Sequence, residues 1–480
     1  MQFLRVFFFG LLALCLSFSS LAQHQLGLNI ENYSGVNSVL SNPANNLTSQ
    51  FSWDINLLSV GVFAENNYAY IGRTNLFHLL KNSNNVLFAP DLDSDYQAGP
   101  DDLIADYYND DRTKFFSFST QVMGPSFMIK LASGHSFGLF TNVRAVSNSR
   151  TIPPQLSYYQ FDETPINESI EVPPVRVAGM AWSELGVNYA FSIPMEDGIL
   201  GIGANAKWLN GYEGFYFANE QNTTIRRLQG DTIAADGPNF HFAFTDGNAN
   251  DSGDFQLSRN GGGFGLDLGA VMTIEGYGAP YQWKFGFSLV DIGKISFSNN
   301  AQRHAFRSIE TVAVPSNDYR DLPNDADSYI QRLSQDILGD SLASQISESF
   351  EVWLPTALNL NADYMIRPNV FVNASLVQRL PLGSNSLKRD NILALSPRFE
   401  KRWLGAALPL VMYNYSDFRM GLSLRLAFLT IGSDNLTSLF GRDDFTGTDF
   451  YFAIKLNPFK LNFGGGGRGS RGKGVKCYNF

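Results

Sequence analysis

Residues 134–138, Gly-His-Ser-Phe-Gly, have the Gly-x-Ser-x-Gly spacing of a serine nucleophile. In enzymes with this motif the serine sits on a sharp turn from a strand into a helix, where its hydroxyl can attack a carbonyl carbon. Here the residues that follow alternate in polarity, with Phe137, Leu139 and Val143 on one side. Ser136 therefore begins a predicted strand, and we do not expect it to be catalytic.

Residues 91–111 carry eight aspartates and begin with the Asp-x-Asp-x-Asp pattern of an EF-hand calcium loop. Asp102 falls at the twelfth position of such a loop, where a ligand is required. The sixth position is Tyr96, although the turn there needs glycine. We interpret the stretch as a solvated acidic loop, and loose calcium binding remains an open alternative.

The remaining residue types exclude several other kinds of site. The five histidines lie far apart, and the chain has no Cys-x-x-Cys or His-x-x-x-His pair, so we predict no metal site and no cofactor. Lys and Arg total 35 against 45 Asp and Glu, a net charge of −10, which argues against nucleic acid as a partner. Cys15 belongs to the N-terminal segment described below, so Cys477 has no partner for a disulfide within the mature chain.

One set of charged residues lies on the polar side of runs in which apolar and polar residues alternate. It holds six basic and four acidic residues: Asp54, Arg144, Glu184, Lys207, Asp267, Lys284, Asp363, Arg419, Arg425 and Lys455. If the runs are strands of one barrel, these side chains face its lumen. They then form either a selective polar passage or a salt-bridged filling, and we favour the filling because buried charges need partners.

The alternating runs are the elements that must position these charges. Residues 198–208 are an example, with Leu200, Ile202 and Trp208 on one face and glycine, Asn205 and Lys207 on the other, a period of two that indicates a strand. Similar runs cover 51–63, 66–73, 115–131, 134–146, 180–193, 263–275, 282–290, 356–366, 369–379, 391–402, 404–414, 418–428 and 449–459.

The length of these runs decides the fold class. Strands of soluble proteins average about 5 to 6 residues, whereas strands that cross a membrane need about 9 to 11. Many of these runs alternate over at least that length, and the aromatic content is 14%. A sheet that faces lipid must close, because no water satisfies its edges. We therefore predict an all-β fold, a transmembrane antiparallel β-barrel of about 14 strands with long surface loops.

The ends of the chain have a different composition. Residues 1–22 have an early Arg5, an apolar run and a small residue at Ala22, which is typical of a secretory signal peptide. We therefore expect an exported protein. The predicted segments are the signal peptide at 1–22, an N-terminal polar segment at 23–49, the barrel at 50–463 with insertions at 74–114, 219–258 and 296–352, and a Gly-rich basic tail at 464–480.

The third insertion contains a predicted pair of helices. Ile330, Leu333 and Ile337 follow helical spacing, and Gly339 ends the first helix. We expect a second short helix to continue to Phe350.

The sequence Ser-Asn-Pro-Ala-Asn-Asn at residues 41–46, which lies just before the first predicted strand, resembles the FadL-like superfamily of outer-membrane barrels. In that superfamily an Asn-Pro-Ala motif lies in an N-terminal hatch packed inside a 14-stranded barrel. The resemblance therefore implies a hatch at residues 23–49 and gives this role to Asn42, Pro43 and Ala44. The charged and glycine-rich interior departs from the fatty-acid transporters of the superfamily.

Four stretches look more narrowly like an uncharacterised Bacteroidota family of such barrels, to which the PorV component of type IX secretion is related. They are LGAVMTIEGYGAPYQWKFGFSLVDIGKISF, WLPTALNLNADYMI, FLTIGSDNL and DFYFAIKLNPF. This resemblance implies a fold more than a function.

These observations together favour a monomeric, non-enzymatic barrel in the outer membrane of a Gram-negative bacterium, surrounded by outer-membrane lipid. The leading hypothesis is that it transports or binds a small amphipathic ligand in a lumen gated by the hatch. An alternative is a surface scaffold or shuttle associated with protein secretion, with a secreted protein partner. An outer-membrane lipid hydrolase is the least favoured reading.

Overall fold

The computed structural model describes residues 25–92, 95–99, 101–156, 165–230, 232–246, 258–276, 279–319, 322–323, 325–441 and 443–458. The predicted signal peptide, the basic tail with Cys477, and Asp93 of the acidic loop lie outside these described residues.

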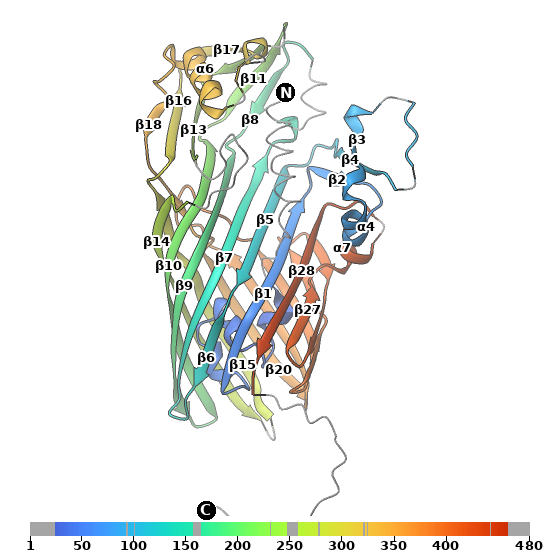
Figure 1. Cartoon of the computed structure of the whole chain (residues 1–480), viewed down its shortest axis with the longest axis vertical. Helices are drawn as coiled ribbons and strands as arrows, with labels where there is room; N and C mark the ends of the chain where they lie inside the picture. Colours follow the sequence, from blue (N-terminus) through green and yellow to red (C-terminus); the bar gives the residue numbers. More distant parts are fainter. Residues whose placement is uncertain are drawn as a thin grey trace, which may run out of the picture.

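The wall of the molecule is a closed antiparallel barrel of 14 strands, as the sequence predicts (Figure 1). The ring closes where the first strand pairs with the last, with Val60 opposite Phe452. Some wall strands are interrupted, and each of these carries two labels. In chain order the wall strands are β1 (Trp53–Asn66), β5 with β6 (Lys114–Met123, Ser126–Lys130), β7 (His135–Ile152), β9 (Arg176–Met195), β10 (Gly198–Asn219), β14 (Gly261–Gly276) and β15 (Ala279–Phe297). They continue with β19 with β20 (Phe350–Trp353, Ala357–Arg367), β21 (Val370–Arg379), β22 (Ile392–Glu400), β23 with β24 (Leu404–Ala407, Leu410–Tyr413), β25 with β26 (Asp417–Met420, Leu422–Leu426), β27 (Leu429–Ser433) and β28 (Gly447–Leu456).

Although the predicted number of strands is right, one member of the predicted set is wrong and one wall strand was missed. Residues 66–73 contain β2 (Ala69–Ile71), which belongs to a separate small sheet. The missed strand is β27, which follows β26 after a two-residue turn that begins at Ala427 with φ 51°. Because that turn has no Gly, Pro or Asn to mark it, the sequence predicts a single strand in place of β26 and β27.

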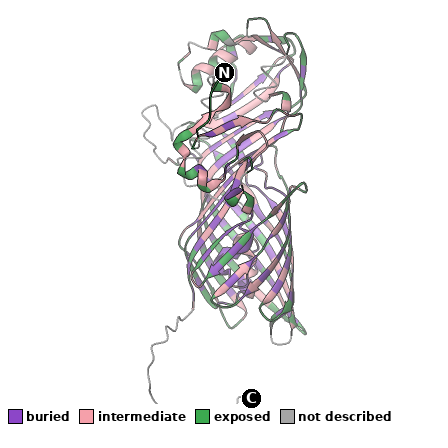
Figure 2. Ribbon diagram, turned by 90° about the vertical axis from the view of Figure 1, so that its right-hand side faces the viewer, coloured by how far each residue is buried: buried purple, intermediate pink, exposed green. Residues whose placement is uncertain are grey.

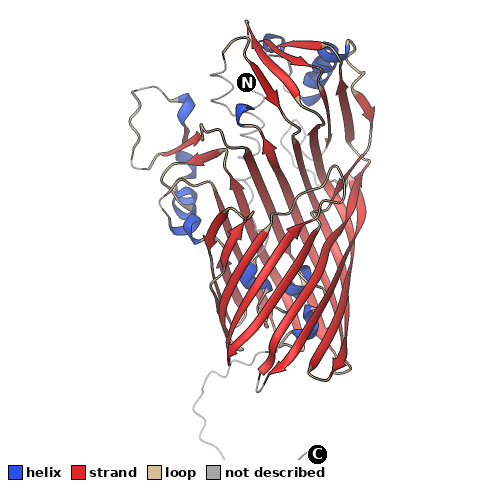
Figure 3. Ribbon diagram, turned by 180° about the vertical axis from the view of Figure 1, so that it is seen from behind, coloured by secondary structure: helices blue, strands red, loops and turns tan. Residues whose placement is uncertain are grey.

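Two smaller assemblies lie outside the wall (Figures 1 and 3). A three-stranded sheet with two helices flanks the barrel: β2, β3 (Val86–Phe88), β4 (Leu103–Tyr107), α4 (Leu76–Lys81) and α7 (Leu436–Phe440), with the short turns η2 (Ser83–Asn85) and η3 (Ala89–Asp91). A four-stranded sheet and a helix stand beyond the long-loop rim: β8 (Ser169–Val172), β11 (Thr223–Leu228), β12 (Thr232–Asp236), β17 (Thr311–Pro315), α6 (Ala326–Leu338), η4 (Pro154–Leu156) and η5 (Ser316–Tyr319). The wall itself is extended there by β13 (Asn239–Thr245), β16 (Ala301–Arg307) and β18 (Gln345–Ser347).

The second helix predicted in the third insertion does not form. The first helix, α6, begins after Asp325, whose side chain accepts from the N–H of Ser328 at 2.7 Å, and ends at Gly339 with φ 79°. Beyond it, Ile346 lies in β18 and Phe350 lies in β19. The edge of β16 offers backbone partners to this segment, and pairing with that edge takes the place of a second helix.

The two faces of the barrel wall differ as the alternation requires (Figure 2). Large apolar side chains are exposed on the outer face, while the polar side chains between them are buried. Toward the long-loop rim this apolar belt includes the ring pair Trp208 and Phe264, and near the short turns it includes Trp283 and Tyr364. Aromatic rows of this kind border the lipid-facing band of membrane barrels. Among the described residues, no helix is long and apolar enough to cross a membrane.

We predict that a charge in the middle of the belt destabilises the barrel. Val187 of β9 is 54% exposed on the apolar face. Val187→Arg should lower the free energy of unfolding in lipid vesicles by about 2–4 kcal/mol, because no water solvates a guanidinium there. Urea titration measures this change. Ile309→Arg is the control, since Ile309 is 93% exposed beyond the rim; equal effects of the two substitutions would contradict the assignment of the belt.

Candidate functional site

The interior of the barrel near the short turns is occupied by residues 25–50, which we call the inner segment (Figure 3). It contains three short helical turns: α2 (Leu26–Asn29), η1 (Gly35–Leu40) and α3 (Asn45–Thr48). Most of its side chains are buried, polar ones included. No described residue of the inner segment joins the strand pairings of the wall. It is held instead by side chains.

The Asn-Pro-Ala motif lies at the centre of these contacts. The Asn42 amide donates to the carbonyl oxygens of Ala270 at 2.9 Å and Phe287 at 3.2 Å, and its own oxygen accepts from the Ala44 N–H at 3.0 Å. Asn188 donates to the Pro43 carbonyl at 2.9 Å. Asn42 thus bonds to two wall strands while its side-chain oxygen stabilises the turn of the motif.

A pair of glycines in the wall makes room for this motif. Gly203 of β10 and Gly269 of β14 lie directly opposite each other. A Cβ at Gly203 would lie 2.7 Å from the Pro43 carbonyl carbon, and one at Gly269 would lie 2.2 Å from the Asn42 side-chain oxygen. Any side chain at either position would push the motif off the wall. This close approach gives a physical reason for glycine on the inner face of both strands.

The beginning of the inner segment is bound by charged groups of the barrel. Arg425 pairs with Glu31, and the Glu400 carboxylate accepts from the Asn32 N–H at 3.2 Å. Burial raises the pKa of the Glu31 carboxyl, while the Arg425 guanidinium lowers it. Asp434, which follows β27, accepts from the Leu26 N–H at 3.0 Å, and its burial raises its pKa to about 6.

Six charges form a network in the middle of the barrel around Asp291. Its carboxylate lies 2.9 Å from Arg144, 2.7 Å from Lys207 and 2.7 Å from Arg389. The other two members are both acidic: Glu184 lies 3.1 Å from Arg144, and Asp267 lies 2.7 Å from Lys207. Three positive and three negative groups therefore neutralise one another, as charges removed from water require.

Asp291 lies at a β-bulge of the wall. The pairing of β14 with β15 shifts between Leu266 and Leu268, so β15 carries an extra residue there. Asp291 has φ 59°, and its N–H donates to Asp267 at 2.7 Å. Such a bulge redirects side chains, and here it adds a carboxylate to the interior.

A second network lies between the wall and the inner segment. Arg398 pairs with Asp363 and Glu400. The Tyr281 hydroxyl lies 2.7 Å from the Asn32 side-chain oxygen and 2.9 Å from the Asp363 carboxylate, so its one hydrogen is shared between them. Lys284 donates to the same Asn32 oxygen at 3.3 Å and lies 4.0 Å from Asp363. Asn32 therefore connects the inner segment with two wall strands, β15 and β22.

Nine of the ten charged residues singled out in the sequence are buried in the structure. Eight of the ten pair among themselves, and the joined pairs are Asp54 with Lys455, Arg144 with Glu184, Lys207 with Asp267, and Lys284 with Asp363. Arg425 pairs with Glu31 of the inner segment, and Arg419, the least buried, pairs with Glu65 and Asp417.

Several ion-pair partners of these ten residues are not among the charged residues predicted from the sequence. Arg398 and Glu400 lie in the predicted run at 391–402, so alternation could have found them. Asp291 lies at the bulge, where alternation breaks, and Arg389 lies in the connection between β21 and β22, which has no period. Glu31 lies in the inner segment, where no strand pattern exists.

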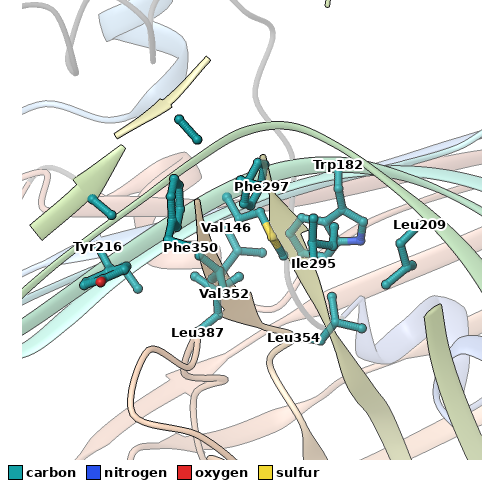
Figure 4. Packing of buried hydrophobic residues seen from close by; sticks show 14 residues of the cluster. Val146, Trp182, Leu209, Tyr216, Ile295, Phe297, Phe350, Val352, Leu354 and Leu387 are labelled. Carbon is teal, nitrogen blue, oxygen red and sulfur yellow. The ribbon is translucent and has the colours of Figure 1, made fainter. Parts of the chain in front are cut away.

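An apolar layer of side chains packs together next to the Asp291 network (Figure 4). It is built from side chains of the wall together with Leu387 of the connection after β21. Trp182 of this layer donates from Nε1 to Glu184 at 2.7 Å, and its ring lies 4.8 Å from the Arg144 guanidinium. The interior is thus filled in three levels: the inner segment, the ion network and the apolar layer.

A polar cavity of about 80 Å³ remains beside the inner segment. One side is formed by Gln25, Asn29 and Asn45, and the other by residues of β15, β20 and β21. Its polar lining suits water or a polar solute better than a hydrocarbon.

Two other candidates from the sequence have ordinary structural surroundings. Ser136 lies in β7 and is buried, with a strand rather than a helix following the motif. In the acidic loop, Asp102 accepts from the Tyr96 hydroxyl at 2.6 Å, and Asp110 is bonded to Arg112 and Lys114. Within the part of the chain that the structure describes, no group of three or more His, Cys, Asp or Glu could hold a metal ion.

Residues 43–434 match the model of a "Family of unknown function (DUF5723)". The chain belongs to this family. No curated protein matches it. The predicted relation to PorV stays a prediction.

Solved structures with a similar outline are membrane channels and a translocator. A TodX deltaS2S3 mutant, a monoaromatic hydrocarbon channel, has a TM-score of 0.40 and 10% identity over 88% of this chain and 94% of its own. The toluene transporter TodX of Pseudomonas putida gives 0.31 and 7% over 89% and 93%. The translocator domain of the autotransporter NalP from Neisseria meningitidis gives 0.32 and 8% over 88% and 93%. Because these TM-scores are low, the barrel assignment comes from the strand pairings described above.

We predict that Asp291 is needed for a stable barrel. Asp291→Asn removes the one carboxylate shared by three cations and leaves them with two, so it should lower the free energy of unfolding by about 3–5 kcal/mol. Urea titration measures this change: the folded barrel, which is recognised by its resistance to heat, should disappear at a lower urea concentration in the variant. Asp236→Asn is the control, because Asp236 forms a half-exposed pair with Arg226 and should cost less than about 1 kcal/mol. A similar loss for both variants would contradict the role of the network.

Proposed function

We propose that this protein is an outer-membrane channel of a Gram-negative bacterium, and that residues 25–50 are its hatch. The observation that carries the proposal is that the hatch takes no part in the strand pairings of the wall. The closed ring of backbone hydrogen bonds does not depend on the hatch, so the hatch can move without opening an edge toward lipid. In this proposal Asn42, Pro43 and Ala44 anchor the hatch to the wall.

The chemistry of the anchor suits a reversible gate. The contacts of Asn42, Asn46 and Asn32 with the wall are hydrogen bonds, and Asn46 donates to Asn188 at 2.8 Å. Each such bond contributes only about 0.5–1.5 kcal/mol net, because water replaces it when it breaks. The hatch also packs apolar side chains against the wall: its residues Val36 and Val39 form one buried cluster with Phe51, Met123, Met128 and Phe140. Release of the hatch therefore exposes this apolar cluster to water and costs more free energy than the loss of the hydrogen bonds alone.

The ten inward charges then border the route that opens when the hatch moves. They are already paired across the wall, so they make the route polar without leaving an isolated charge. Small ligands with a polar part fit this lining, which extends the amphipathic class expected from the sequence.

The proposal predicts that weakening the hatch raises permeability. Deletion of residues 25–50 should increase the rate of glucose-driven swelling of liposomes that contain the barrel. Gly269→Ala should do so in part, because the added Cβ displaces Asn42, and this variant serves if the deletion does not fold. Stopped-flow light scattering measures the rate.

Gly265→Ala is the matched control. It lies on the same face of the same strand, and its Cβ would meet only side-chain atoms of Leu354 and Lys207 at 3.3–3.4 Å. It should leave the swelling rate unchanged. A barrel that stays as impermeable without its hatch as with it would refute the channel.

A surface scaffold that engages a secreted protein is the second candidate. The sheet of β8, β11, β12 and β17 with α6 stands beyond the rim on strands far longer than a membrane requires; β10 alone has 22 residues. A channel has no need of this assembly. A protein that copurifies with the intact chain and is lost when residues 308–344 are removed from a folded barrel would favour the scaffold.

A further inference from the structure

The cavity beside the hatch is lined by amides, hydroxyls and two cations, together with apolar residues such as Leu26, Ile30 and Leu40. On the barrel side, the paired strands β20 and β21 present Asn361 opposite Ser375, and they also contribute Asn359 and Asn373. Gln121 of β5 completes the far end. Amides and hydroxyls both donate and accept hydrogen bonds, so the cavity offers many partners to a hydroxylated solute.

Two cations face this cavity, and both have donor capacity left. Lys284 is 6% exposed, and its ammonium, which has three N–H groups, has one hydrogen bond, at 3.3 Å, to Asn32. Its nearest carboxylate, Asp363, is 4.0 Å away and is already bound by Arg398. Arg389 is 8% exposed and uses one terminal nitrogen for Asp291, while its buried Nε has no partner among the described residues.

The acidic groups of the interior lie behind these cations. Asp363, Asp291 and Glu400 do not line the cavity, and the charged residues that do line it are Lys284 and Arg389. A buried acceptor also faces the cavity without a partner: the side-chain oxygen of Asn359, whose amide donates to the Ser41 carbonyl at 2.8 Å. The cavity therefore presents positive charge together with unsatisfied donors and an unsatisfied acceptor. Such groups cost free energy when they stay unpaired.

We propose that this cavity is a binding site for a small hydroxylated carboxylate, such as a hydroxy acid or a sugar acid. The carboxylate lies against Lys284 and the Arg389 Nε, and the hydroxyls bond to the amides of β20 and β21. This proposal gives the class of ligand that the proposed channel would carry, and in that respect it rests on the proposed function. Binding itself can be measured without transport.

The test is isothermal titration calorimetry on the full-length protein in detergent, with three probes. D-gluconate is the hydroxylated carboxylate, D-glucitol has the same chain with a hydroxymethyl group in place of the carboxylate, and octanoate is an apolar carboxylate. We expect gluconate to bind at least tenfold more tightly than the other two. Equal binding of glucitol would overturn the role of the cations, and tighter binding of octanoate would overturn the polar class.

The matched variants are Lys284→Met and Lys294→Met, which make the same change in the same strand. Lys294 lies outside the cavity in a half-exposed pair with Glu351. Lys284→Met should weaken gluconate binding at least tenfold, and Lys294→Met should leave it unchanged. If Lys284→Met does not fold, Asn361→Leu tests the same wall with the same expected loss.

The two proposals fail separately. Absence of gluconate binding, or binding that Lys284→Met leaves intact, refutes the site while hatch deletion still accelerates liposome swelling. Binding with the expected loss, together with a barrel that stays impermeable without its hatch, supports the site and refutes the channel.

Discussion

The closing of β28 onto β1 is the constraint on which the rest of the structure depends. A strand that faces lipid has no water to satisfy its backbone, so each wall strand must pair on both sides. Closure forces every second side chain inward, and fourteen strands enclose more space than their own inward side chains fill. Many of the inward positions here are glycine, amides and charges, with apolar side chains among them, and a separate part of the chain completes the interior.

Three parts of the chain meet this demand, and they differ in how firmly they are held. The network around Asp291 binds β7, β9, β10, β14 and β15 to the connection that carries Arg389. The apolar layer above it includes Leu387 from that same connection. Both belong to the wall or to a short link between two wall strands. The inner segment enters from the N-terminus, and side-chain contacts rather than strand pairings attach its described residues to the wall.

The fold could be read from the sequence because a period of two is all that a barrel wall requires. The same period placed ten charges on the polar face, and the structure buries nine of them. What could not be read depends on departures from that period. Asp291 lies at a bulge, and Arg389 lies in an aperiodic connection. The register of the inner segment on Gly203 and Gly269 depends on contacts between residues more than 150 positions apart, which no local pattern contains.

The inner-face glycines also bear on how the inner segment is held. Other glycines on the wall face it in the same way, since a Cβ at Gly61 would meet Gln25 and one at Gly201 would meet Leu47. A permanent plug could be held by large side chains of the wall that interlock with it, as in any core. Around the Asn-Pro-Ala motif the wall recedes to bare backbone, and amide side chains supply the bonds. Elsewhere Val36 and Val39 of the inner segment, together with Phe51 just after it, pack against large wall side chains such as Met123 and Phe140. The inner segment is thus held in two ways, by amide hydrogen bonds over the glycines and by an apolar cluster.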